Sequence, residues 1–130
     1  MKSLPRNNLY NALLLLCLLG GAREVYSAEQ STNARNVSLK KGALFVSVRA
    51  NLIKAGWRPA HIHDSEYEYT GTERILAERH IYEVEACSTD RGSLCIFYYV
   101  AKQGCLRIDT VGEKLDEMHV TRWDHTCPKR

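Results

Sequence analysis

Apolar and polar positions alternate along residues 80–111, and this alternation predicts three antiparallel strands in succession. Two short loops, residues 90–92 and 102–104, divide the stretch, and each ends in glycine. A three-residue hairpin loop with glycine last is typical of a type I turn followed by a left-handed residue. The pattern therefore predicts one hairpin centred on Arg91 and a second centred on Gln103.

These two centres decide which side chains share a face of the sheet, because side chains alternate along a strand. The first hairpin places Cys87 opposite Cys95, and the second places Val100 opposite Leu106. The face predicted to meet the core carries Tyr82, Val84, Ala86, Ile96, Tyr98, Val100, Leu106, Ile108 and Thr110. The face predicted to stay partly open to water carries Glu83, Glu85, Cys87, Cys95, Phe97, Tyr99, Cys105, Arg107 and Asp109.

A helix is predicted before the strands. Its apolar residues recur at helical spacing at Leu44, Phe45, Val48, Leu52 and Ile53. We expect Gly56 to take the left-handed position after the last turn, with Trp57 folded back on Leu52. Pro59 prevents the helix from resuming.

Two further elements complete the predicted fold. Residues 73–79 predict a short helix, and residues 118–123 predict a fourth strand. The alternation does not decide whether the face with Val120 or the face with Trp123 meets the core. A helix with an apolar stripe and a sheet with an apolar face bury each other. The predicted fold class is therefore α+β, with one main helix packed on a four-stranded antiparallel meander and stabilised by disulfides.

The N-terminus has the three parts of a secretory signal peptide. Lys2 and Arg6 precede an apolar run over residues 12–19, which is too short to span a bilayer, and small residues follow it. We expect cleavage after Ser27, with Ala22 and Ala28 as alternative sites. The sequence thus predicts export to the periplasm or the extracellular space, with no membrane anchor in the mature chain.

Removal of residues 1–27 leaves 103 of the 130 residues, which is enough for one domain. The polar residues 28–41 predict a flexible N-terminal arm, and residues 42–130 predict a single α+β domain. The removed segment carries three basic side chains and one acidic one, so the formal charge falls from +3 to +1. Because the domain is near neutral and has no basic stripe, its charge gives no reason to expect a nucleic-acid partner.

Four cysteines remain in the mature chain, and an even number in a small exported domain indicates disulfides. The predicted register places Cys87 and Cys95 opposite each other, close enough for a cross-strand bond. Cys105 then pairs with Cys127 and ties the C-terminal tail to the third strand. The spacing of the four cysteines along the chain lacks the close pairs that are typical of a zinc site.

The chemistry-bearing residues offer two weaker alternatives. His61 and His63, with Asp64 as a third ligand, are a candidate metal site if the segment is extended. Glu83 and Glu85 are a conceivable acid–base pair, but cross-strand ion pairs explain these charges without catalysis. We therefore expect no catalytic residues, no cofactor and no enzyme activity.

The predicted open face is the stronger candidate for function. It groups aromatic side chains within a charged rim, which is the composition of a protein-binding surface. The predicted binding surface consists of Phe97, Tyr99, Glu83, Glu85, Arg107 and Asp109. The alternative is that the N-terminal arm or the C-terminal tail folds over the aromatic residues.

The mature chain carries the motifs Arg49-x-x-Leu52-x-x-Ala55-Gly56-Trp57-x-Pro59, Glu83-Val84-x-Ala86-Cys87-Ser88, Cys95-x-Phe97, Gly104-x-Leu106-x-Ile108-x-Thr110-x-Gly112-Glu113 and Val120-x-x-Trp123. With these it resembles a set of small exported bacterial proteins of uncharacterised function. The helix-plus-sheet unit is also similar to secreted beta-lactamase-inhibitor-like and peptidase-propeptide-like modules. At the level of fold, this resemblance implies binding rather than catalysis, and it assigns no functional residue.

The expected function is accordingly an exported, disulfide-stabilised binding module that inhibits or neutralises another envelope or secreted protein. The first alternative is a small metal-binding protein or metal-dependent hydrolase that uses His61, His63 and Asp64. The second is a structural envelope protein, which self-association would reveal.

Overall fold

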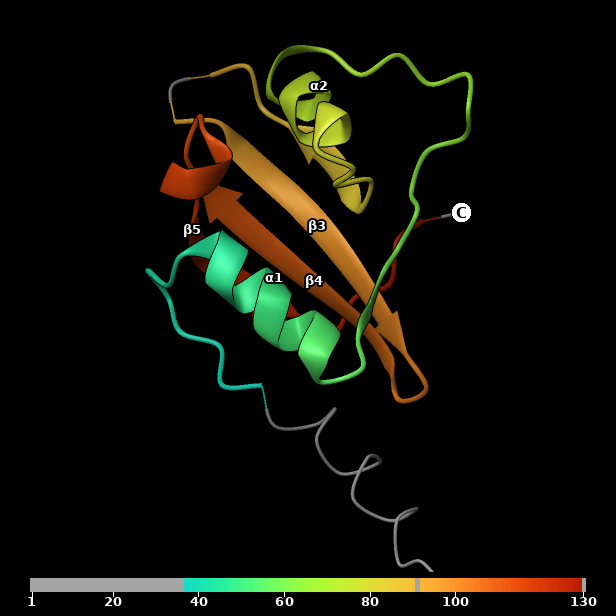
Figure 1. The fold of residues 1–130 in the computed structure, drawn as a ribbon, viewed down its shortest axis with the longest axis vertical. Helices are drawn as coiled ribbons and strands as arrows, with labels where there is room; N and C mark the ends of the chain where they lie inside the picture. The colour runs from blue at the N-terminus through green and yellow to red at the C-terminus, as the bar shows by residue number, and fades with distance from the viewer. Residues whose placement is uncertain (1–36, 91, 130) are drawn as a thin grey trace, which may run out of the picture.

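The structure is a computed structural model that describes residues 37–90 and 92–129 (Figure 1). In these residues, two α-helices cover one side of a five-stranded antiparallel sheet, so the predicted α+β class is confirmed. The elements are α1 (Phe45–Lys54), β1 (Arg58–Pro59), α2 (Gly71–Glu78), β2 (Val84–Cys87), β3 (Leu94–Ala101), β4 (Gly104–Val111), the 3-10 turn η2 (Leu115–Glu117) and β5 (His119–Asp124). The predicted signal peptide and residues 28–36 of the predicted arm lie outside the described residues.

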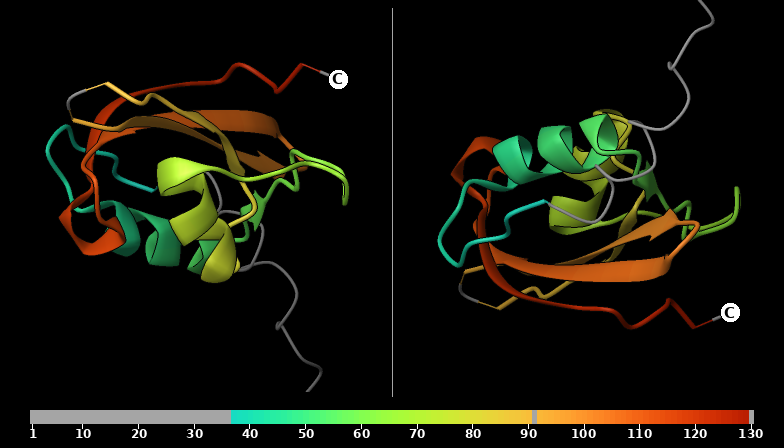
Figure 2. Two further views of the ribbon diagram at one scale, coloured as in Figure 1. Left: turned by 90° about the horizontal axis from the view of Figure 1, so that it is seen from above. Right: turned by 90° about the horizontal axis from the view of Figure 1, so that it is seen from below.

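The strands from β2 to β5 pair in chain order, as predicted for the meander. The sheet has a further strand, β1, that the alternation did not predict. It pairs with β3 on the edge that β2 also occupies. Figure 2 shows both helices on one side of the sheet and the C-terminal end on the other. We call the side away from the helices the outer face.

Helix α1 ends as predicted. Gly56 has a φ of 91°, and its N–H donates to the carbonyl of Ile53 at 3.0 Å. The N–H of Trp57 donates to the carbonyl of Leu52, also at 3.0 Å. This pair of hydrogen bonds is the Schellman motif, and both Trp57 and Leu52 are buried in the core cluster.

Helix α2 ends with the same motif but without glycine. His80 takes the left-handed position at a φ of 58°, and its N–H donates to Ala77 at 2.9 Å. The N–H of Ile81 donates to Leu76 at 3.0 Å. The sequence predicted this helix at residues 73–79, so the prediction begins two residues late and ends one residue late relative to Gly71–Glu78.

The apolar stripe of α1 packs on the inner face of the sheet. Phe45 stacks on Phe97 of β3 with ring centroids 4.1 Å apart. Val48 and Leu52 continue the stripe and are buried. Burial of each such side chain stabilises the fold by about 1.5–3 kcal/mol. Packing of this face, rather than helix propensity, therefore holds a ten-residue helix in place.

The β3–β4 hairpin differs from its predicted register by one residue. Ala101 pairs with Gly104, so the loop contains two residues instead of three, and Tyr99 pairs with Leu106. A one-residue slip moves every side chain of one strand to the other face. The inner face of these strands therefore carries Cys95, Phe97, Tyr99, Leu106, Ile108 and Thr110.

The β2–β3 hairpin has the predicted register at its closed end, where Cys87 pairs with Cys95. A bulge then shifts the register, so that Val84 pairs with Phe97. Val84 therefore lies on the inner face with Phe97, and Glu83, which precedes β2, is also buried.

Both predicted disulfides are present among the described residues. Cys87 and Cys95 are bonded with a Cα–Cα distance of 4.1 Å, and Cys105 and Cys127 with a distance of 5.0 Å.

The segment before α1 closes the edge of the sheet beside β5. The N–H of Gly42 donates to the carbonyl of Val120 at 2.7 Å. Val120 pairs with Thr110 and Trp123 pairs with Ile108, with a register shift between them, so both side chains lie on the inner side. Val37 and Leu39 also pack against the core. This end of the predicted flexible arm is therefore part of the domain.

Candidate functional site

The outer face of the sheet carries both apolar and charged side chains. The register places on it Ala86 from β2, Leu94, Ile96, Tyr98 and Val100 from β3, and Cys105, Arg107, Asp109 and Val111 from β4. Strand β3 is thus apolar on both faces, which is typical of a strand that is covered on both sides. In this structure, the helices cover only the inner one.

The prediction that six binding residues lie on the open face is wrong for three of them, which are buried. Phe97 and Tyr99 are 0% exposed, and Glu83 is 1% exposed. The two-residue loop of the β3–β4 hairpin turns the aromatic residues inward, and the carboxylate of Glu83 bonds to Arg49 and Tyr99 on the inner side. The other three predicted residues lie on the outer side of the sheet and are half-buried.

Four apolar side chains adjoin one another near the closed end of the β2–β3 hairpin: Ala86, Leu94, Ile96 and Val111. We name them the apolar patch. Leu94 and Ile96 are two residues apart on β3 and share its outer face. Ile96 pairs with Ala86 of β2, and Leu94 pairs with Val111 of β4. Leu94 is 54% exposed, the highest value among the large hydrophobic residues described. Grouped exposed apolar side chains mark interaction surfaces.

Charged side chains border the apolar patch on the β4 side. Asp109, which pairs with Ile96, accepts hydrogen bonds from Arg107 Nε at 2.6 Å and Nη2 at 3.1 Å. Arg122 of β5 donates to the same carboxylate at 3.0 Å. The hydrogen bonds to Asp109 raise the pKa of Arg107. These contacts fix a polar rim with a defined geometry.

The C-terminal tail is held at the opposite end of the outer face. Cys127 is bonded to Cys105, and His125 Nδ1 lies 3.2 Å from the carbonyl oxygen of Cys105. Tyr98, the aromatic residue of β3 that the register places outside, is only 3% exposed. Burial raises its pKa, and the charge of Glu85 adds to this effect. Among the described residues of the outer face, the most exposed large apolar side chain is therefore Leu94, in the apolar patch.

A buried charge cluster occupies the inner face beside α1. Arg49 Nε donates to Glu83 Oε1 at 2.6 Å, and the hydroxyl of Tyr99 donates to the same oxygen at 3.1 Å. Burial lowers the pKa of Arg49, but the hydrogen bond and charge of Glu83 outweigh it and leave the pKa raised. The predicted acid–base pair does not form, because Glu83 points inward while Glu85 lies near Tyr98 on the outer face.

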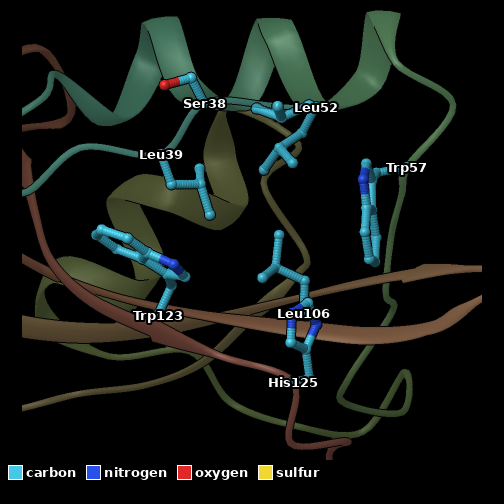
Figure 3. Close-up of a pocket in the computed structure, with 8 residues that line it drawn as sticks. Ser38, Leu39, Leu52, Trp57, Leu106, Trp123 and His125 are labelled. Carbon is cyan, nitrogen blue, oxygen red and sulfur yellow. The ribbon is translucent and has the colours of Figure 1, made fainter. Parts of the chain in front are cut away.

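A pocket of about 240 Å³ opens between α1, β4 and β5 on the helix side of the sheet (Figure 3). It is lined by Val37, Ser38, Leu39, Leu52, Trp57, Leu106, Trp123 and His125. We name it the tryptophan pocket, because both tryptophans of the chain line it.

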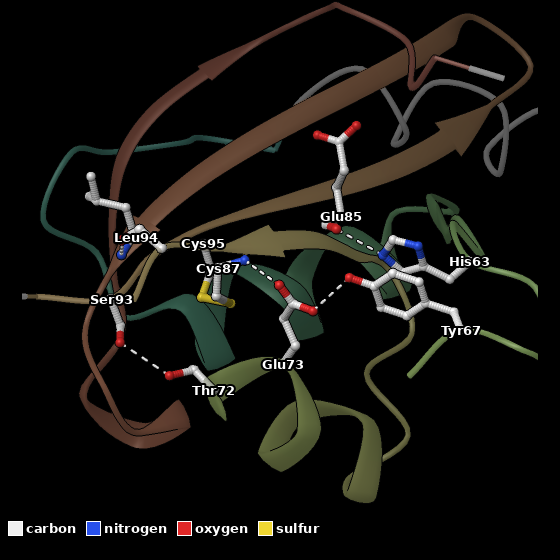
Figure 4. Close-up of a disulfide and its surroundings, with 10 residues drawn as sticks. His63, Tyr67, Thr72, Glu73, Glu85, Cys87, Ser93, Leu94 and Cys95 are labelled. Carbon is white, nitrogen blue, oxygen red and sulfur yellow. Dashed lines mark hydrogen bonds between the residues drawn. A yellow bond between two sulfur atoms is a disulfide. The ribbon is translucent and has the colours of Figure 1, made fainter. Parts of the chain in front are cut away.

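The segment with His61 and His63, which were predicted to bind a metal, packs its histidine rings against tyrosine rings. His63 stacks on Tyr67 with centroids 3.5 Å apart, and its Nε2–H donates to the carbonyl of Glu85 at 2.8 Å (Figure 4). The hydroxyl of Tyr67 donates to Glu73 Oε2 at 2.9 Å, and Glu73 Oε1 accepts the N–H of Cys87 at 2.8 Å. These contacts fasten the loop to α2 and β2.

His61 packs edge-on against Tyr82 at 5.2 Å, away from the stack that His63 forms. Across residues 37–90 and 92–129, the structure has no group of three or more His, Cys, Asp or Glu side chains placed to hold a metal ion. The metal-dependent alternative stays a prediction. Elemental analysis of untagged protein tests it, with a His61→Ala, His63→Ala double variant as the control.

Comparison with known proteins finds no matching family model, no matching curated protein and no matching solved structure. No helix within the described ranges is long and apolar enough to cross a membrane.

Sequence reasoning missed the apolar patch and the tryptophan pocket for different reasons. The apolar run of residues 94–101 indicated a strand with two apolar faces, but the wrong loop length assigned its even-numbered residues to the core. The pocket brings together segments that are far apart in the chain, such as Leu39, Trp57 and Trp123. No local pattern signals such a meeting.

Proposed function

We propose that the protein is an exported, disulfide-stabilised binding module that holds another protein against the outer face of its sheet. Its partner is an envelope or secreted protein, which it inhibits or neutralises. The observation that carries this proposal is the 54% exposure of Leu94 next to Ile96, in a strand whose inner face is fully packed. The proposal thus keeps the predicted class of function and moves the contact surface to the apolar patch.

The anatomy of the surface supports a protein as the partner. Binding surfaces combine an apolar centre with a polar rim, and they exclude water from the centre when the partner docks. The apolar patch supplies the centre, and the Arg107–Asp109–Arg122 contacts supply the rim on one side.

The scaffold also holds the surface in one shape before binding. The Cys87–Cys95 bond joins β2 to β3 directly below the patch, and Ser88 N–H and Leu94 N–H add hydrogen bonds across the same hairpin end. A surface that is already ordered loses less conformational entropy on association.

The test compares two exposed apolar residues on opposite sides of the domain. Leu94→Asp places a charge in the apolar patch, and Ile53→Asp places the same charge on the exposed side of α1, where Ile53 is 42% exposed. With the mature protein as bait in envelope extract, we expect Leu94→Asp to reduce capture at least about tenfold and Ile53→Asp to leave it unchanged.

Equal capture by the wild type and Leu94→Asp would remove the apolar patch as the contact surface. Urea unfolding of both variants checks that the fold is retained. Sizing of the mature protein at several concentrations separates a foreign partner from a second copy. A dimer that Leu94→Asp dissociates would show self-association instead of capture.

A further inference from the structure

The tryptophan pocket lies on the other side of the sheet from the apolar patch and has no part in the proposed protein contact. Its volume of about 240 Å³ exceeds the roughly 150 Å³ of a cavity that binds benzene, yet it is too small for a folded element of a partner. A single ring or a short branched group fits this space.

The walls of the pocket favour a flat apolar guest. Trp57 and Trp123 stand on opposite sides of the opening, with Leu52 above and Leu106 below in the view of Figure 3. Aromatic rings pair with one another in stacked or edge-to-face arrangements that add about 0.5–1.5 kcal/mol to the burial of area. Trp123 is 37% exposed, so a guest that covers it gains buried apolar area.

His125 supplies a hydrogen-bonding ring to the pocket, in addition to the hydroxyl of Ser38. Its Nδ1 lies 3.2 Å from the carbonyl oxygen of Cys105, and a carbonyl oxygen only accepts. Nδ1 therefore carries the hydrogen, and Nε2 of the neutral ring is an acceptor. A guest with one O–H or N–H group can donate to this nitrogen.

We propose that the tryptophan pocket is a binding site for a small planar aromatic group that carries one hydrogen-bond donor, as phenols and indoles do. The Leu and Trp side chains bury the ring, and His125 Nε2 accepts the hydrogen bond. The pocket is thus a second, independent site on a domain whose outer face binds protein.

The two tryptophans make the site directly observable. The chain has two tryptophans and both line the pocket, so both indole N–H signals in a ¹H–¹⁵N NMR spectrum report on it. Titration of the mature protein with phenol should shift these signals saturably, with a dissociation constant on the order of 1 mM or tighter. Toluene, which has the same shape without the donor, should bind about three- to tenfold more weakly.

Variants in and outside the pocket make the assignment specific. Leu39→Trp fills the pocket and should abolish the saturable shift. Ile53→Trp adds the same side chain on the exposed side of α1 and should retain it. If Leu39→Trp does not fold, Ser38→Trp serves instead, because Ser38 lines the pocket and is exposed. His125→Ala should weaken phenol several-fold and leave toluene unchanged within about twofold.

A titration without saturable shifts in the indole signals would overturn the proposal. Unchanged phenol affinity in the filled variant would do the same, since it would place the ligand elsewhere. Equal weakening of phenol and toluene by His125→Ala would overturn the role of His125 as the acceptor.

Discussion

The Nε atom of Arg49 lies 2.6 Å from Oε1 of Glu83, and this ion pair joins α1 to the chain entering β2. Glu83 is 1% exposed, whereas the Arg49 side chain keeps 26% of its exposure. Within the described residues, the second carboxylate oxygen of Glu83 is buried without a hydrogen-bond partner. Arg49 and Tyr99 therefore compensate the buried negative charge of the Glu83 carboxylate.

Arg49→Met should destabilise the protein by about 3 kcal/mol, because it leaves an uncompensated charge inside the domain. The value lies at the low end for a broken buried pair because Arg49 is partly exposed. Urea unfolding at neutral pH measures the change. Arg74→Met, at an exposed position of α2, is the matched control and should cost less than about 0.5 kcal/mol. An Arg49→Met variant as stable as this control would show that Glu83 needs no cation.

The same cluster predicts a loss of stability at alkaline pH. Burial and the charge of Glu83 raise the pKa of Tyr99 well above the ordinary tyrosine value of 10.0, at which the unfolded chain ionises. The unfolded state thus loses this proton first, so the contribution of Tyr99 is complete below pH 10.0 and declines as the pH rises further. The free energy of unfolding of the wild type should fall more steeply above this pH than that of Tyr99→Phe. Parallel curves would contradict the burial of this hydroxyl.

His80→Gly should stabilise the protein by about 0.5–1 kcal/mol, because glycine adopts the left-handed conformation of residue 80 without the cost that a side chain incurs. The hydrogen bond of His80 to the hydroxyl of Tyr82 is exposed, so its loss offsets little of this gain. Arg79→Gly is the control at the preceding position, which has an ordinary φ of −99°, and it should destabilise. Thermal unfolding ranks the variants, and a His80→Gly protein below the wild type would refute the assigned cap.

Truncation of two neighbouring residues of β3 should cost very different amounts of stability. Phe97→Ala removes a ring that stacks on Phe45 and should cost about 3–5 kcal/mol. Ile96→Ala acts on the outer face, where Ile96 is half-buried, and should cost about 1 kcal/mol. The sequence-based register predicts the reverse order. Chemical denaturation of the two variants therefore discriminates between the two registers.

Local sequence patterns predicted the main helix and most of the strands of this fold. The stop of α1 at Gly56 and the pairing of Cys87 with Cys95 both follow from patterns within a few residues, and the structure confirms them. The sequence did not predict which face of β3 points inward. A loop with glycine at its third position fits both a two-residue and a three-residue turn, and the two turns place opposite faces of β3 inward. Both faces of this strand are apolar, so composition does not correct the error.

The proposed binding surface differs in its residues from the one that the sequence predicted. The sequence placed it on the side of the sheet away from the helix, and the proposal keeps that side. Glu83, which the sequence had grouped with Phe97 and Tyr99, is buried on the inner side together with them. A contact such as Arg49 with Glu83, 34 residues apart, depends on the tertiary fold and has no local signature.

The apolar patch and the buried charge cluster both depend on the pairing of β3 with β4, so this register is the central claim. The N–H and C=O of Tyr98 bond to Glu83 and Ala60 on the side away from β4, so Tyr98 and Arg107 form a non-hydrogen-bonded pair. Their Hα atoms are therefore close. The most direct measurement is the cross-strand NOE pattern of a protein that comprises residues 28–130. We expect a strong Hα–Hα NOE between Tyr98 and Arg107, and an NOE that joins Tyr98 to Ile108 instead would contradict the account.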